Sequence, residues 1–231
     1  MSISKKLAFW GLVLGLLSCK TEAQKTGGVR LGHLIWSEGN LNTKVFRNGD
    51  SILIARSNAD WMNAHQAKQP AMIYYNFDES LDSLHGPLYN VWAVKDSRGL
   101  IPQGWRLPTK ADIDSMIVDR RVPYMAAVPG NTIDGTGPWT NASYTFLKER
   151  DTCQFRAWPS GDLAGYTEVL DRLDFGSWGN RIVWWLSDTV PPNPDHLAFW
   201  TLYNTRGAFH INAGGTRGDH PSGHYIRMLK Q

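Results

Sequence analysis

The sequence lacks a hydrophobic stretch near its N-terminus that is long enough to cross a membrane. A spanning helix needs about 20 apolar residues, whereas the apolar run at residues 7–17 has 11 and ends at Cys19-Lys20-Thr21-Glu22. The run follows Lys5 and Lys6, and a short apolar core behind basic residues is typical of a signal peptide. We therefore expect residues 1–18 to be removed on export.

A cysteine follows this run directly, in the segment Leu16-Leu17-Ser18-Cys19. The segment resembles the lipobox of bacterial lipoproteins, in which a peptidase cuts before the cysteine and diacylglycerol is attached to its sulfur. Ordinary secretion without lipid is the alternative, but it leaves Cys19 unexplained. We expect lipidation at Cys19, a flexible polar stalk at residues 19–28, and an outer-membrane lipoprotein that faces the periplasm or the cell surface.

Cysteine is otherwise nearly absent, because only Cys153 remains after Cys19. Exported domains with small cores usually depend on disulfides, and this chain cannot form an internal one once Cys19 is lipidated. Its stability must come from burial of apolar side chains, for which the 213 residues after position 18 are ample. We interpret Cys153 as a buried small hydrophobic residue.

The sequence also lacks a large excess of either positive or negative charge. The chain has 24 Lys and Arg against 21 Asp and Glu, and the balance without residues 1–18 is 22 to 21. Nucleic-acid binding usually requires a clustered basic face, whereas the basic residues here are scattered, with Arg120-Arg121 the one adjacent pair after Lys6. The sequence therefore predicts no nucleic-acid partner.

Several catalytic motifs are missing. The sequence has no Gly-x-Ser-x-Gly elbow, no Gly-x4-Gly-Lys-Ser/Thr phosphate loop and no His-Glu-x-x-His zinc motif. We expect a non-catalytic protein. The alternative is an enzyme acting on polysaccharide through two carboxylates, drawn from Asp162, Glu168, Asp171 and Asp174, whose spacing fits a solvated surface equally well.

Tryptophan, by contrast, is abundant, with eleven in the chain and ten after residue 18. Together with many Gly, Pro, Asn and Asp residues, it indicates one compact, loop-rich α+β domain at residues 29–231. A helix is predicted at residues 110–120, because Thr109 and Asp112 have capping-box spacing. A second helix is predicted after Ser57.

Strands are expected over much of the remaining sequence. Asn48-Gly49 predicts a hairpin between residues 44–47 and 51–54, and the apolar run at residues 182–186 suits a central buried strand. Further strands are predicted at residues 89–94 and 225–229, with a second hairpin from residues 198–203 and 208–213. Long loops are expected at residues 130–141, 161–180 and 189–196.

Six segments, in order along the chain, resemble the motifs of a known family. They are W-S-E-G-N-L-N at residues 36–42, F-R-N-G-D at 46–50, L-Y-N-V-W-A-V at 88–94, R-G-L-I-P-Q-G-W-R-L-P-T at 98–109, W-W-L-S-D-T at 184–189 and G-H-Y-I-R-M-L at 223–229. The pattern is similar to the Fibrobacter succinogenes major paralogous domain of exported lipoproteins, from Gly32 to Leu229. Met228 stands where the family usually has cysteine, in agreement with the missing disulfide.

The resemblance implies a C-type-lectin-like fold, with two short helices, a curled, mostly antiparallel sheet and long loops. It implies no catalytic activity, and a fold alone does not settle function. Lectins of this fold often bind sugar through calcium. Asn193-Pro194-Asp195 loosely resembles their calcium-binding loop, so calcium binding remains an alternative. For zinc, the best cluster is Asp219, His220 and His224 with His210. A polar turn is the simpler interpretation, and we expect no metal site and no cofactor.

Tryptophans in the loop-rich half are the best candidates for a binding site. Indole faces stack on sugar rings while amides and carboxylates bond hydroxyls, although tryptophan mostly packs in cores. Of the strand neighbours Trp184 and Trp185, at least one should be buried, since they face opposite ways. We expect a glycan or a protein partner to be bound by Trp139, Trp158, Trp178 and Asn180. The alternative is an accessory or structural subunit of an outer-membrane complex.

Overall fold

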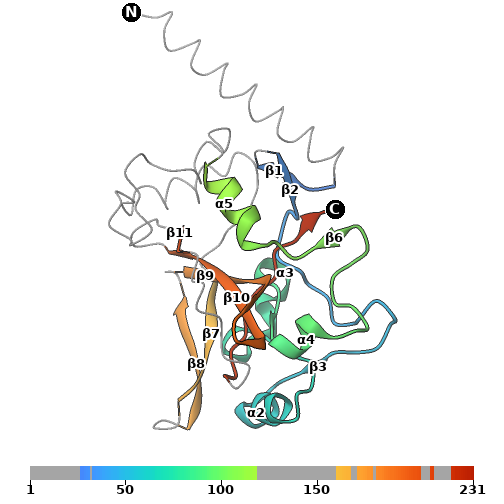
Figure 1. Ribbon diagram of the computed structural model, residues 1–231. Coiled ribbons are helices and arrows are strands. Elements are labelled where there is room, and N and C mark those ends of the chain that lie inside the picture. Colours follow the sequence, from blue (N-terminus) through green and yellow to red (C-terminus); the bar gives the residue numbers. More distant parts are fainter. Residues whose placement is uncertain are drawn as a thin grey trace, which may run out of the picture.

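The computed structural model describes residues 27–31, 33–118, 160–167, 171–178, 181–203, 209–210 and 220–231. These residues form an α+β structure with mostly antiparallel sheets, as predicted (Figure 1). Cys19, Cys153 and the loop expected at residues 130–141 lie outside the described residues. No helix within them is long and apolar enough to span a bilayer.

The strands form three sheets. The first has the order β1-β2-β12-β6, from Val29–Leu31, Leu34–Trp36, Leu229–Lys230 and Trp105–Arg106. The second has the order β11-β10-β9-β7-β8, from Phe209–His210, Asn193–Tyr203, Arg181–Val190, Ser160–Thr167 and Arg172–Trp178. The third has the order β3-β4-β5, from Leu53–Ile54, Ala71–Ile73 and Leu88–Tyr89. In the described part of the chain these strands pair antiparallel, except β3 with β4 and β7 with β9.

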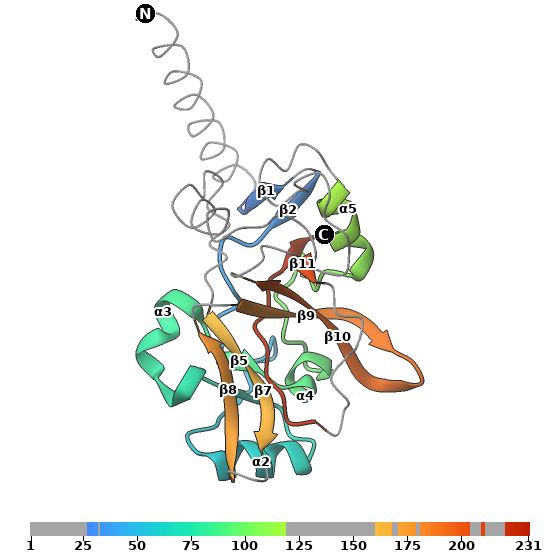
Figure 2. The ribbon, with the colours of Figure 1, turned by 90° about the vertical axis from the view of Figure 1, so that its left-hand side faces the viewer.

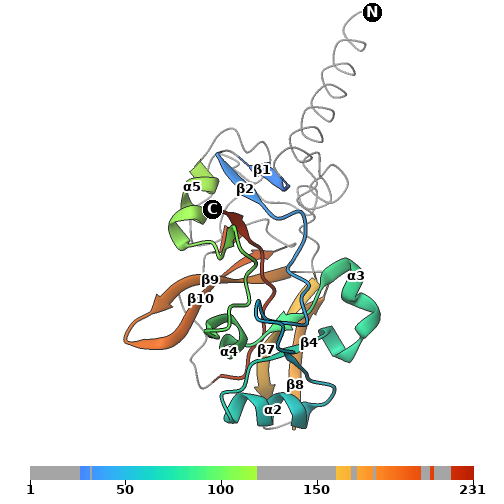
Figure 3. The ribbon, with the colours of Figure 1, turned by 90° about the vertical axis from the view of Figure 1, so that its right-hand side faces the viewer.

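Short helices surround these sheets. They are α2 (Asn58–Gln66), α3 (Asp82–His85), α4 (Val91–Lys95) and α5 (Lys110–Val118), with 3-10 turns η1 (Tyr75–Phe77) and η2 (Glu79–Leu81). The two predicted helices are confirmed as α2, whose Asp60 amide donates to Ser57 Oγ, and α5. Helix α5 lies beside β1 and β2, and α2 lies at the opposite end of the molecule near β7 and β8 (Figures 2 and 3).

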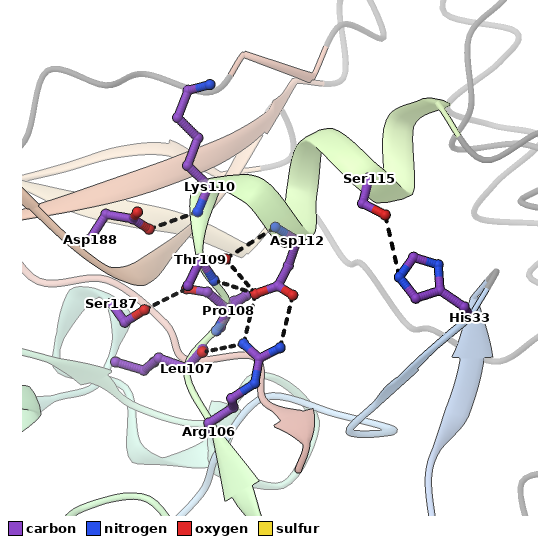
Figure 4. A network of polar contacts seen from close by, with 10 residues as sticks. All are labelled: His33, Arg106, Leu107, Pro108, Thr109, Lys110, Asp112, Ser115, Ser187 and Asp188. Carbon is purple, nitrogen blue, oxygen red and sulfur yellow. Dashed lines mark hydrogen bonds and ion pairs between the residues drawn. The ribbon is translucent and has the colours of Figure 1, made fainter.

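Helix α5 begins in a network of polar contacts (Figure 4). Thr109 N–H donates to Asp112 Oδ2 at 2.7 Å, and Asp112 N–H donates to Thr109 Oγ1 at 3.1 Å, which is the predicted capping box. The Arg106 guanidinium donates to both carboxylate oxygens of Asp112, at 2.6 and 2.8 Å. Lys110 N–H donates to Asp188 Oδ2 at 2.7 Å. The helix is thereby fixed to both β6 and β9.

The strand predicted at residues 89–94 is wrong after its first residue, because the chain turns into helix α4. Asn90 caps this helix: its Oδ1 accepts from Ala93 N–H at 2.8 Å and from Ala71 N–H at 3.1 Å, and its Nδ2 donates to Gln69 O at 2.8 Å. The apolar run of the motif therefore reflects burial of a short helix rather than of a strand.

The loops predicted at residues 161–180 and 189–196 are also wrong. Most of the first is the hairpin of β7 and β8, and the second joins β9 to β10 at Pro191-Pro192. Gly165 has φ +153°, a conformation that residues with a side chain rarely adopt, and a Cβ there would meet the His220 ring.

Strand β9 is the central buried strand that its apolar run predicts. Trp184 stacks on Trp200 with ring centroids 4.2 Å apart, while Trp185 packs in a second cluster with Met72 and Tyr89. Both tryptophans are fully buried, because both faces of the sheet are covered. The two predicted hairpins are confirmed by the Val45–Ser51 bridge and by the pairing of β10 with β11.

The strand predicted at residues 225–229 is shorter than expected, because β12 contains only Leu229–Lys230. The residues before it cross from sheet to sheet, and their backbone pairs with β7, β5, β9 and β2 in turn: Gly223 with Leu163, His224 with Tyr89, Tyr225 with Val183 and Trp185, and Leu229 with Trp36. The side chains of residues 225–229 are all buried, and Arg227 lies beside Ser37 and Trp184.

We predict that Asn90→Ala lowers the free energy of unfolding by about 2–4 kcal/mol, because two buried N–H groups lose their acceptor. Urea unfolding measures the change. Gln66→Ala, at an exposed position of α2, is the control and should change stability by less than about 0.5 kcal/mol. Equal stability of the two variants would contradict the capping role of Asn90.

A second prediction concerns acid stability. Burial raises the pKa of Asp112, but hydrogen bonds from Arg106 and Thr109 outweigh it and lower this pKa to about 2. Because the folded-state pKa lies below that of the unfolded chain, the contribution of Asp112 is complete above about pH 4 and is lost as the pH falls towards 2. Asp112→Asn should therefore cost roughly 2 kcal/mol at pH 7 and little near pH 2.

Urea unfolding of wild type and variant across this pH range measures the difference. The control is Asp114→Asn on the same helix, whose carboxylate forms an exposed ion pair with Lys110 at 2.8 Å. Such pairs contribute about 0–1 kcal/mol. A gap between wild type and Asp112→Asn that stays constant from pH 7 to pH 2 would rule out the ion pair as its cause.

Candidate functional site

Of the residues predicted to bind a ligand, the structure describes Trp178. Trp139, Trp158 and Asn180 lie outside the described residues. Trp178 ends strand β8, where its register partner is Ser160 of β7. The residue is 43% exposed, which is unusual for so large an apolar group.

The exposed indole is held in place by neighbouring rings. The Tyr75 ring centroid lies 4.8 Å from that of Trp178, and the His85 ring meets it edge-on at 5.0 Å. Phe175 packs on Tyr75 at 5.4 Å and on Phe77 at 5.3 Å. We call these five residues the aromatic cluster. It presents a large, fixed ring to solvent, which reduces the entropy cost of binding a partner.

Phe77 reaches the aromatic cluster from a strained backbone. Asn76 and Phe77 have φ +53° and +61°, a region that costs non-glycine residues roughly 1–2 kcal/mol each. Phe77 nevertheless stays 36% exposed, so burial recovers only part of this cost. No sequence motif pointed to Tyr75, Phe77 or Phe175 as site residues. The signal available was the aromatic density of Tyr74-Tyr75-Asn76-Phe77.

His85 joins the aromatic cluster to the core. It ends α3, and its Nδ1 lies 2.6 Å from Ser160 Oγ. Burial lowers the pKa of His85 below its ordinary value, so the ring is neutral at neutral pH. A Ser–His contact can mark an activated nucleophile, but Ser160 is only 1% exposed and a substrate cannot reach it. The contact instead fixes the ring of His85.

A cavity of about 290 Å³ adjoins His85 on the surface. Two segments form it, one at residues 39–42 and one along α3. Its lining is mostly small or polar: Gly39, Asn40, Asn42, Asp82, Ser83, Leu84, His85 and Gly86. Leu84 is its one large apolar side chain and is 61% exposed.

Asparagines hold the two segments of the cavity together. Asn40 Nδ2 donates to His85 O at 2.8 Å, and Asn42 Nδ2 donates to Asp82 O at 3.1 Å. The other end of the Asn40 amide accepts from the Trp184 indole N–H at 2.8 Å. The N-L-N segment of the motif therefore holds α3 in place by hydrogen bonds. This role cannot be predicted from its sequence.

Charged side chains around the site form opposite-charge pairs. Lys44 Nζ lies 3.2 Å from Asp82 Oδ2, and the Tyr74 hydroxyl and Asp82 raise the pKa of Lys44, which keeps it charged. Arg181 donates to both carboxylate oxygens of Asp162 at 2.9 Å. Each pair leaves little net charge at its position.

Three of the four carboxylates considered for polysaccharide cleavage lie in the described part of the chain. Asp162 is 2% exposed and bound by Arg181; burial raises its pKa, and Arg181 opposes this shift. Asp171 accepts the hydroxyl hydrogen of Tyr166 at the end of the hairpin. Asp174 is exposed on β8, and Glu168 lies outside the described residues.

Two histidines of the possible zinc cluster differ in burial. His220 is exposed, whereas His224 is buried between Trp185 and Phe199, with ring centroids 4.4 and 4.9 Å away. Burial lowers the pKa of His224 to about 3. Asp219 is outside the described residues. Among the residues that are described, no three His, Cys, Asp or Glu side chains are grouped to hold a metal ion.

Comparison with known proteins identifies the family of this chain. A family model described as the Fibrobacter succinogenes major domain matches residues 29–230, and the chain therefore belongs to that family. The match agrees with the predicted resemblance from Gly32 to Leu229. No curated protein and no solved structure matches the chain.

Proposed function

We propose that this member of the Fibrobacter succinogenes major domain family is a lipid-anchored, non-catalytic protein of the cell envelope that binds a glycan or a protein partner. The observation that carries the proposal is Trp178, an exposed indole fixed by Tyr75 and His85 beside a surface cavity. The proposed fold is C-type-lectin-like, which the family and the mostly antiparallel sheets support.

The lipid anchor is supported by the N-terminal sequence. Lys5 and Lys6, the short apolar run and Cys19 follow one another in the order of a lipoprotein signal. Two or more acyl chains anchor a protein durably, whereas one does not. A lipidated Cys19 would place the domain next to the membrane, on a stalk of polar residues.

Binding is favoured over catalysis because the polar groups behind Trp178 have structural partners. His85 contacts Ser160, and Asp162 is enclosed with Arg181. A general acid or base has to reach its substrate, and these groups face the protein interior. The site thus offers a surface for contact rather than reactive groups.

A second candidate function is an accessory subunit of an outer-membrane complex. It is favoured by exposed apolar side chains close to the same site, namely Leu84 at 61% and Phe77 at 36%. Clustered apolar exposure often marks a protein interface. In this case the aromatic cluster would be covered by a partner chain.

The anchor predicts a specific labelling result. When the full-length protein is expressed in a lipoprotein-processing bacterium with labelled palmitate, it should incorporate label and fractionate with membranes. Cys19→Ala should abolish both, because the acceptor sulfur is removed. Cys153→Ala is the matched control and should behave as wild type. Label or membrane attachment that persists in Cys19→Ala would refute the lipidation site.

Binding is tested by recovering the native lipidated protein from its own membranes in mild detergent and identifying the bound material. We expect a protein or glycan to be recovered with wild type and lost with Trp178→Ala. Val45→Ala is the control, because Val45 is 44% exposed but does not line the cavity. Recovery that is unchanged in Trp178→Ala, or polysaccharide turnover by the purified protein, would contradict the proposal.

A further inference from the structure

We infer that the ligand of this site is a neutral oligosaccharide, with one sugar ring in the cavity of Asn42 and Asp82 and a neighbouring ring on the face of Trp178. This inference rests on the proposed function and specifies its ligand class. It follows from the shape of the site, its open hydrogen-bonding groups and its charge.

The site has room for a ligand of more than one ring. His85 both lines the cavity and contacts Trp178, with ring centroids 5.0 Å apart, so the cavity and the indole adjoin each other. Sites for drug-sized molecules enclose about 300–1,000 Å³, and about 290 Å³ lies at the lower end of that range. One ring-sized group fits the cavity, and the rest of the ligand extends over Trp178.

The open polar groups suit hydroxyls. Asn42 uses its amide N–H on Asp82 O, while its Oδ1 has no partner among the described residues. Ser83 is exposed, and its hydroxyl likewise has no partner in the described part of the chain. The amide oxygen of Asn42 can accept a hydrogen bond, and the hydroxyl of Ser83 can donate or accept one. A sugar hydroxyl, which both donates and accepts, can bind to either group.

The same lining argues against a peptide side chain. Peptide grooves are lined mainly by apolar residues that receive apolar anchors. Here the lining is asparagine, aspartate, serine, glycine and histidine, with Leu84 the only large apolar residue. The apolar contribution comes instead from the flat face of Trp178, which matches the C–H face of a sugar ring.

Charge balance indicates that the saccharide is neutral. Asp82 is paired with Lys44 and Asp162 with Arg181, so each of these charges is offset by one of opposite sign. An acidic or phosphorylated sugar would favour a cluster of arginines, and the lining of this cavity contains none.

The test uses the detergent-solubilised full-length protein on an array of saccharides. The probes are cellotetraose, xylotetraose, mannotetraose, the corresponding monosaccharides and tetragalacturonate. We expect binding to at least one neutral tetrasaccharide, binding at least about tenfold weaker for its monosaccharide, and none for tetragalacturonate. Because the ligand is neutral, affinity should change less than about twofold between 50 and 500 mM NaCl. The inference would be overturned if the protein bound only tetragalacturonate, or if it bound none of these saccharides.

Variants measured by calorimetry place the ligand. Trp178→Ala should weaken binding about tenfold, through loss of ring stacking and apolar contact, while Trp178→Phe should stay within about threefold of wild type. Asn42→Ala, which alters an exposed side chain, should also weaken binding. Val45→Ala and Gln66→Ala are controls and should bind as wild type. If Trp178→Ala and Asn42→Ala both bind with wild-type affinity, the assigned site is wrong.

The outcomes separate this inference from the proposed function. If membranes yield a protein partner that Trp178→Ala loses and that no saccharide displaces, the binding function stands and the saccharide inference is wrong. If neither a protein nor a saccharide depends on Trp178, both are wrong.

Discussion

The structure depends on the hydrogen bonds that the C-terminal segment at residues 223–229 makes to all three sheets. Gly223 pairs with β7, Tyr225 with β9 and Leu229 with β2, while His224 pairs with β5. Two of the sheets contain strands of only two or three residues, which are weak alone. The segment gives them a common buried partner, so the domain can be stable without a disulfide.

The same segment positions the binding site. The Tyr225 hydroxyl donates to Ser160 O at 2.9 Å, and Ser160 Oγ contacts His85, the residue between the cavity and Trp178. From the other side, the Trp184 indole of the core donates to Asn40, which clamps α3. An exposed ring can therefore stay fixed because its supports continue into the core, and such preorganisation favours binding.

Local signals were predictable from the sequence, and long-range ones were not. The caps at Ser57 and Thr109 and the turn at Asn48-Gly49 involve residues within four positions of each other, so the pattern alone indicates them. The helix cap at Asn90 was not predicted. Its side chain also accepts a hydrogen bond from Ala71 N–H, which is far away in the chain. The contacts that build the site join residues 45 and 75 positions apart, and no spacing rule reveals them.

Hydrogen exchange by mass spectrometry tests most directly whether the cavity and Trp178 form one binding site. Exchange is compared for the solubilised full-length protein with and without a carbohydrate extract of its own envelope, since bound ligand slows local opening. If they form one site, exchange should slow together at residues 39–42, in α3 and at the end of β8, and stay unchanged in α5. Slower exchange confined to other segments, or none in these three, would contradict a shared site.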